Sequence, residues 1–270
     1  MYKKIETEYS LLDDKVFKIF MEDKEIAKIV IEILLNRKIK DLEYVNTEKE
    51  ITGLGMERTI RYDVLCKYTE EKYYDVELQV VKQDDLMERF RIYQSFLDKH
   101  TIRKGEKEYI KARETFIIFI CNFDLFEDGL GEYNIVNYCI ENKKICNDKT
   151  NKKIINLKGE KIKNPEVKEL IKLFKEKEYN DSDKKIDKLG KRLEEIMNTN
   201  QFYRRYEVMQ KKERMLIDEG IKIGIEKGMK QGMIIKQIEM LKEFKVDEET
   251  IINRVQKEYG ITREEVEKYL

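Results

Sequence analysis

Residues 61–66 read RYDVLC and residues 73–79 read YYDVELQ, and these two stretches decide the fold. In both stretches apolar side chains alternate with polar ones, which is typical of β-strands that are buried on one face. The second strand therefore carries Asp75, Glu77 and Gln79 on the face away from its apolar residues. Because acidic residues are disfavoured inside strands, these positions predict a function for the polar face.

The segment between the two strands is polar and predicts a tight antiparallel hairpin. A turn centred on Glu70 places Asp63 directly opposite Glu77, and Arg61 opposite Gln79. Side chains that oppose each other on one face have Cβ atoms roughly 5 Å apart. Two carboxylates at that separation repel each other unless a cation lies between them, and Mg²⁺ commonly uses one or two carboxylates plus waters and phosphate oxygens. The hairpin thus predicts a magnesium site suited to phosphodiester hydrolysis.

A simpler interpretation of the same polar face is that water solvates it. Arg61 would then pair with Asp75 or Glu77, and no metal would be needed. The pattern of Asp63, thirteen intervening residues and Glu77 does not by itself separate the two interpretations.

The segments around the hairpin alternate between the helical and the strand period. Helices are predicted within residues 12–36 and from an Asp84 cap through Leu97, and strands at 42–45, 116–123, 134–140 and 153–157. The predicted order is helix, three strands, helix, strand. This order is typical of an α/β fold with a small mixed sheet.

The sequence beyond Pro165 is helical in character and predicts an extension. Helices are expected at 167–177, 182–197, from 202 onward, 247–259 and 263–270. Thr262 and Glu265 form the signature of a capping box at the start of the last helix. The final two helices have helix-turn-helix spacing, but the acidic residues of the second favour packing over base readout.

Four glycines recur every four residues within the long helical segment: Gly220, Gly224, Gly228 and Gly232. Isoleucines and methionines lie between them, so a partner helix could approach closely along this stretch. The charge of the segment argues against the membrane version of this motif. Two interpretations stay open, self-association through residues 218–270 and a helix that glycine weakens.

The composition excludes several other classes of protein. Of 270 residues, 41% are apolar and 41% are charged, which is typical of a globular chain with a highly charged surface. The longest apolar run, 116–121, is too short to cross a bilayer, so a cytoplasmic protein without a membrane partner is expected. The four cysteines show no C-x-x-C pair and His100 is the single histidine, which disfavours structural zinc.

The net charge does not by itself attract the chain to nucleic acid, because 55 basic residues balance 55 acidic ones. Residues 143–192 are locally basic, with 17 Lys and Arg against 9 Asp and Glu. This stretch is a candidate DNA-binding surface, and an ordinary solvated surface explains it equally well.

Specific motifs resemble the recombination-promoting nuclease (Rpn) and putative transposase family of the PD-(D/E)XK nuclease superfamily. The resemblance is carried by the two strands quoted above, by Arg89 and Tyr93 on the following helix, and by the opening motif from Asp14 to Phe20. It is dense over residues 10–125 and looser beyond, where the glycine-periodic tail also matches.

The resemblance implies roles for individual residues. Asp63 and Glu77 correspond to metal ligands, and Gln79 stands where the wider superfamily often has lysine. Asp14 corresponds to an acidic position that completes the metal shell, although an N-cap role for it is equally open. Lys82 carries an amine but has the wrong strand parity to replace Gln79. Arg61, Arg89 and Tyr93 are candidates for DNA binding, and the latter two are equally candidates for packing.

The expected protein is therefore a magnesium-dependent DNA endonuclease, linked to recombination or mobile elements, in which manganese is expected to substitute for magnesium. The family implies a restriction-endonuclease-like α/β core of mixed sheet flanked by helices. Residues 1–160 are expected to form the nuclease domain and residues 161–270 a helical extension. The alternatives are a catalytically inactive DNA-binding or oligomerisation protein with the same fold, and a nuclease directed at RNA.

Overall fold

The computed structural model describes residues 1–52, 59–69, 72–101 and 113–270. These residues divide into two compact units, Met1–Glu207 and Val208–Leu270. The predicted turn at Glu70 lies outside the described residues. The candidate residues named above all belong to the first unit.

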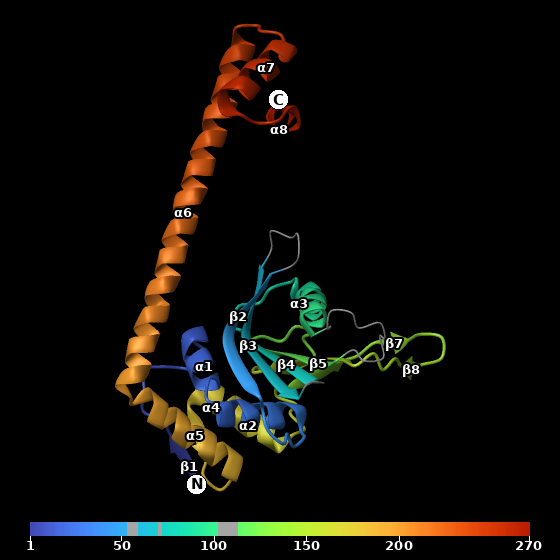
Figure 1. Ribbon diagram of the computed structural model, residues 1–270, viewed down its shortest axis with the longest axis vertical. Helices are drawn as coiled ribbons and strands as arrows, with labels where there is room; N and C mark the ends of the chain where they lie inside the picture. Colours follow the sequence, from blue (N-terminus) through green and yellow to red (C-terminus); the bar gives the residue numbers. More distant parts are fainter. Residues whose placement is uncertain (53–58, 70–71, 102–112) are drawn as a thin grey trace. The chain divides into compact units, whose positions relative to one another are not determined.

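A six-stranded mixed sheet forms the centre of the first unit (Figure 1). Its strand order is β2-β3-β4-β5-β9-β6, with bounds β2 Tyr44–Thr52, β3 Thr59–Thr69, β4 Lys72–Gln79, β5 Glu114–Cys121, β9 Thr150–Asn156 and β6 Glu132–Ile135. The pairs β2–β3, β3–β4 and β9–β6 are antiparallel, whereas β4–β5 and β5–β9 are parallel. The predicted α/β architecture with a mixed sheet is therefore confirmed.

Helices cover both faces of this sheet (Figure 1). On one face lies α3, Leu86–Thr101, between β4 and β5 in the chain. The other helices of the unit are α1 Asp14–Met21, α2 Lys24–Leu35, α4 Pro165–Glu176 and α5 Lys184–Met197. Each of these four begins at an Asp or Asn N-cap whose side chain accepts from backbone N–H groups of the first turn. The predicted order of helices, three strands, helix and strand is confirmed.

The core beneath α3 fixes the position of this helix over the middle of the sheet. Phe90 of α3 packs edge-on against Phe119 of β5, with ring centroids 4.4 Å apart. Leu86 and Leu97 join the same buried cluster. Since Glu77 is the register partner of Phe119 in the parallel β4–β5 pair, the same face of β4 also lies beneath α3.

The register of β3 against β4 agrees with a turn centred on residue 70. Val64 pairs with Val76 and Leu65 with Asp75, and an irregularity lies between Lys67 and Thr69. The backbone pairing ends at Val64 and Val76, one residue before Asp63 and Glu77. The two residues at the candidate site therefore face each other where the backbone ladder has stopped.

Some local predictions are corrected by the structure. The strand expected at 42–45 begins at Tyr44 and continues to Thr52, because it pairs along β3. The strand expected at 134–140 is split, because β6 ends at Ile135 and β7, Tyr138–Cys139, pairs separately with β8, Lys144–Ile145. The strands β1 Tyr2–Lys4, β8 and β10 Glu178–Asn180 were not predicted. These strands are too short to show a period in the sequence.

The compact first unit extends beyond the expected domain boundary at residue 160. Helices α4 and α5 pack against α2 within it, and β10 pairs with the N-terminal strand β1. A close approach fixes α5, since a Cβ added to Gly190 would lie 2.3 Å from the Tyr179 ring. The first half of the predicted extension is thus built into the same unit as the sheet.

The second unit begins within the long helix that the sequence predicts from residue 202 onward. Helix α6, Asn200–Glu243, continues through all four glycines, and its C-terminal turns pack against α7, Glu248–Tyr259, and α8, Arg263–Glu267. The predicted capping box of Thr262 and Glu265 is present at the start of α8. In the described ranges, no helix is long and apolar enough to cross a membrane.

Candidate active site

Asp63 and Glu77 are bonded to each other's strands through their carboxyl groups. The backbone N–H of Asp63 donates to Glu77 Oε1 at 2.7 Å. In return, the N–H of Leu78 donates to Asp63 Oδ2 at 3.2 Å. Carboxylates have therefore taken the place of backbone acceptors at the point where the β3–β4 ladder ends. The two residues are neighbours, as the turn geometry predicts.

Lys18 of α1 forms an ion-pair bridge between two acidic residues of the site. Its Nζ lies 3.1 Å from Asp63 Oδ1 and 2.7 Å from Asp14 Oδ2. The Lys18 side chain is only 5% exposed. Burial acts to lower the pKa of Lys18, but the charges of Asp63 and Asp14 outweigh burial and raise it. Lys18 is accordingly held in its charged form.

Burial dominates the electrostatics of the remaining carboxyls. It raises the pKa of Asp63, against which the Lys18 ammonium acts. Asp75 and Glu77 are fully buried beneath α3, and burial raises the pKa of both well above the usual range. Neighbouring carboxyls raise the pKa of Glu77 further, Asp75 more than Asp63. The Arg89 guanidinium of α3 acts in the opposite direction on Asp75, but burial outweighs it.

Gln79 is held in place by Arg89 of α3. Arg89 Nη1 donates to Gln79 Oε1 at 2.7 Å and to Gln83 Oε1 at 2.5 Å, while Nη2 donates to the Tyr93 hydroxyl at 3.2 Å. The guanidinium also lies over the rings of Tyr93 and Phe119, at 5.5 and 5.7 Å from their centroids. Arg89 and Tyr93 therefore connect α3 to the polar face of β4.

The solvated interpretation of the polar face is wrong for three of its residues. Asp75, Glu77 and Gln79 are all buried, because α3 covers the face on which they lie. Arg61 is exposed, and the Tyr93 hydroxyl donates to its backbone carbonyl at 3.4 Å. Contact with water therefore does not explain why polar residues occupy this face.

The N-cap interpretation of Asp14 is also wrong. Asp13 caps α1, since its side chain accepts from the N–H groups of Lys15 and Val16. Asp14 is the first helical residue, and its carboxylate is directed to Lys18 one turn later. Asp14 therefore belongs to the ion-pair bridge with Asp63.

No role at the site was predicted for Lys18 from the sequence. Its spacing of four residues from Asp14 is typical of a surface pair on a helix. Its place among the buried positions of α1, which include Phe17 and Ile19, was the available signal. By contrast, Lys82 is exposed and pairs with Glu127 at 3.0 Å. Its amine is used away from the hairpin.

The donor set of the site fits a hard divalent cation. In the parts of the chain that the structure describes, no three His, Cys, Asp or Glu side chains are grouped as a ready metal cluster. Magnesium commonly needs only one or two carboxylates, with water and phosphate oxygens as further ligands. Both oxygens of Asp75 are buried without a hydrogen-bond partner, next to the Glu77 carboxyl. Unpartnered carboxyl oxygens of this kind are the donors that such a cation prefers.

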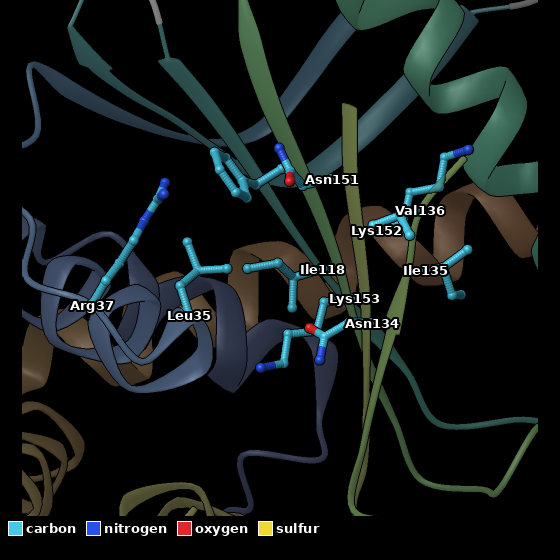
Figure 2. A pocket seen from close by; sticks show the side chains of 10 residues that line it. Leu35, Arg37, Ile118, Asn134, Ile135, Val136, Asn151, Lys152 and Lys153 are labelled. Atoms are coloured by element: carbon cyan, nitrogen blue, oxygen red, sulfur yellow. The ribbon is translucent and has the colours of Figure 1, made fainter. Parts of the chain in front are cut away.

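A separate pocket of about 160 Å³ lies on the opposite face of the sheet (Figure 2). It is lined by Leu35 and Arg37 near the end of α2 and by residues of β5, β6 and β9. Arg37 lies over the Phe116 ring at 4.2 Å and donates to the Tyr74 hydroxyl at 3.2 Å. None of the candidate site residues lines this pocket.

The basic stretch 143–192 is spread over several elements, and several of its basic residues are in ion pairs. Lys153 pairs with Glu132, Lys185 with Glu166, and Lys191 with Asp187. Surface pairs of this kind reduce the local field that would attract phosphate.

Comparison with protein families decides the identity of the fold. A family model described as PD-(D/E)XK nuclease family transposase matches residues 11–230. The chain belongs to this family. The matched range includes Asp14, Lys18, Asp63, Glu77 and Gln79. Comparison with curated proteins and with solved structures gives no match.

Membership of the PD-(D/E)XK nuclease transposases confirms the resemblance that the two strands predict. It also explains the mixed sheet with flanking helices as a restriction-endonuclease-like α/β fold. Family membership supports a nuclease or transposase-like function for the chain.

Proposed function

We propose that this chain is a magnesium-dependent DNA endonuclease that hydrolyses phosphodiester bonds, with manganese able to replace magnesium. The observation that carries the proposal is the direct contact between the carboxyl group of Glu77 and the backbone of Asp63, in a member of a nuclease family. Facing carboxyls with raised pKa values destabilise the folded apo protein, and a bound divalent cation would offset that destabilisation.

In this proposal Asp63 and Glu77 hold the metal, and Asp14 completes its shell. When bound, the metal supplies an activated water and neutralises charge on the phosphate. Gln79 orients the attacking water or a phosphate oxygen. Because Gln79 Oε1 accepts from Arg89, the amide nitrogen is the end of this side chain that can donate.

The proposed substrate is DNA, bound with little sequence specificity. Arg61 is exposed on β3 next to the candidate ligand Asp63, and we expect it to contact phosphate. Arg89 and Tyr93 act on the substrate through Gln79, since the guanidinium donates to three protein oxygens. The description of the family as transposases supports a role in recombination or in mobile elements.

A second candidate is a protein that keeps the nuclease fold and binds DNA without cutting it. The burial of Glu77 favours this alternative, because its side chain is 1% exposed and a catalytic carboxyl must reach metal and substrate. A third candidate is a nuclease directed at RNA, which would use the same carboxyls.

Residues 218–270 are proposed to pair copies of the chain as a homo-oligomer, as a helical extension to the nuclease domain. The exposed apolar side chains of α6 support this, among them Ile221, Ile225, Met229 and Met233, each more than half exposed. A Cβ added to any of the four glycines would meet nothing within 4 Å. Covering these side chains with a second helix would remove apolar surface from water.

The experiment that separates the three candidates is incubation of purified full-length protein with supercoiled plasmid and with RNA. The DNA endonuclease converts plasmid to nicked and linear forms with magnesium or manganese, and not with EDTA. Binding without cleavage under all conditions indicates the inactive alternative. Faster cleavage of RNA than of DNA indicates the third.

A further inference from the structure

Lys18 differs from an ordinary helical ion pair in its burial. Lys191 and Asp187 of α5 have the same spacing and a similar separation, 2.6 Å, but the Lys191 side chain is 54% exposed. Lys18 is 5% exposed and reaches a second carboxylate, Asp63, on a different element. Surface pairs contribute little to stability, whereas burying an ammonium costs several kcal/mol unless its partners compensate.

The Lys18 ammonium contacts the hairpin as well as Asp14 of its own helix. Its Nζ lies 3.1 Å from Oδ1 of Asp63, and the other oxygen of that carboxylate accepts from the backbone of β4. Two other cations near the hairpin are engaged away from Asp63, since Lys82 pairs with Glu127 and Arg89 donates to Gln79. Lys18 thus brings positive charge to the oxygen atoms proposed as metal ligands.

We propose that Lys18 belongs to the active site. Its ammonium holds Asp63 in place and supplies, beside the scissile phosphate, the positive charge that Gln79 lacks. This inference rests on the proposed nuclease function. A preorganised cation next to the reacting phosphate stabilises the charge that develops during hydrolysis. The same charge repels a divalent cation bound at Asp63, so the ammonium limits metal affinity rather than creating it.

These two effects predict a distinctive combination of changes in cleavage and in metal binding. Removing the ammonium should lower cleavage while leaving metal binding as tight as before or tighter. A lysine that only supported the fold would instead lower cleavage, metal binding and stability together.

The test compares Lys18→Gln with wild type in three measurements: plasmid cleavage, manganese affinity by calorimetry, and binding of uncleaved DNA in EDTA. We expect cleavage to fall by about 100-fold, as when one transition-state donor is removed. Manganese affinity should not weaken, and DNA binding should stay within about twofold because phosphate contacts elsewhere dominate it. Lys18→Arg keeps the charge and should recover much of the cleavage.

Lys153→Gln is the matched control, because Lys153 is also buried and paired with one carboxylate, Glu132, but lies on β9 away from the hairpin. It should cleave like wild type. A cleavage loss below about tenfold in Lys18→Gln overturns the inference, as does a parallel loss of manganese affinity. Wild type that cuts no nucleic acid contradicts the proposed function itself, which is a distinct failure.

A second pair of variants keeps the test decisive if Lys18→Gln does not fold. Asp14→Asn and Asp14→Asn/Lys18→Gln differ only in the ammonium, and the double variant keeps the net charge of the wild-type bridge. The double variant should cleave at least tenfold more slowly than Asp14→Asn. Equal, measurable cleavage by the two variants overturns the inference, as does weaker manganese binding by the double variant than by Asp14→Asn.

Discussion

The backbone N–H of Asp63 donates to the Glu77 carboxyl at 2.7 Å, and the carboxyl of Asp63 in turn accepts from the N–H of Leu78. Each acidic residue therefore uses one oxygen to hold the other's strand. The remaining carboxyl oxygens of the site are held by Lys18 or lie in the buried region beneath α3. This reciprocal arrangement makes the geometry of the site depend on both residues together.

Divalent metal should stabilise the wild-type protein against unfolding, because it binds the folded site and not the unfolded chain. At 100 times the dissociation constant, the gain is about 2.7 kcal/mol. Asp63→Asn and Glu77→Gln each remove one proposed ligand and should lose most of this gain. Thermal unfolding with manganese and with EDTA measures it, and an equal metal-dependent shift in all three proteins would place the metal elsewhere.

The apo protein should become less stable as pH rises from about 5 to 8. Burial raises the pKa of Asp75 and Glu77 in the folded state, so the folded protein binds more protons than the unfolded chain above about pH 4. Stability is then lost as these groups ionise. Asp75→Asn cannot ionise and should show a shallower loss. Urea unfolding in EDTA at the two pH values tests this, and identical pH dependence in both proteins would contradict it.

Arg61→Ala and Arg89→Met should have different effects on DNA binding and on stability. Arg61 is exposed, so its loss should lower the salt dependence of DNA binding by about one phosphate contact and affect unfolding less than Arg89→Met does. Arg89 donates to Gln79, Gln83 and Tyr93, so its loss should lower the free energy of unfolding by roughly 1–3 kcal/mol. A reduced salt slope for Arg89→Met with unchanged stability would show that Arg89 contacts DNA directly.

Gly224→Ala combined with Gly228→Ala separates the two interpretations of α6. A Cβ at either position meets nothing within 4 Å in the single chain, and alanine is favoured over glycine by about 1 kcal/mol inside a helix. If the glycine face pairs with a second copy, the added methyl groups should lower the mass measured by light scattering. Gly190→Ala, which meets the Tyr179 ring, should instead destabilise the first unit. A mass unchanged by the double substitution would contradict pairing through these glycines.

Much of the fold was predictable because apolar periodicity and turn position are local properties. The register of β3 against β4 follows from the polar segment between them, and it brings Asp63 to Glu77. The burial of Asp75 and Glu77 was not predictable from β4 itself, since it depends on how α3 packs across the sheet. The apolar residues Leu86, Phe90 and Leu97 of α3 pointed to that packing only once the position of the helix was known.

The first helix shows two limits of sequence interpretation. Asp13 and Asp14 are both suitable caps, and only the extended backbone at Asp13 decides between them. Lys18 has the spacing of a surface pair with Asp14, and its burial results from contact with β3, a long-range feature. The local sequence shows neither that Asp13 is the cap nor that Lys18 contacts Asp63.

The most direct test of the account is cleavage of supercoiled plasmid by wild type, Glu77→Gln and Glu132→Gln, each with magnesium and with EDTA. Glu132 is a strand glutamate paired with Lys153, and it serves as the matched control. We expect metal-dependent cleavage by wild type and Glu132→Gln and none by Glu77→Gln, while all three proteins still bind DNA. Cleavage that persists in Glu77→Gln, or in EDTA, would contradict the assignment of Asp63 and Glu77 as the metal-binding pair.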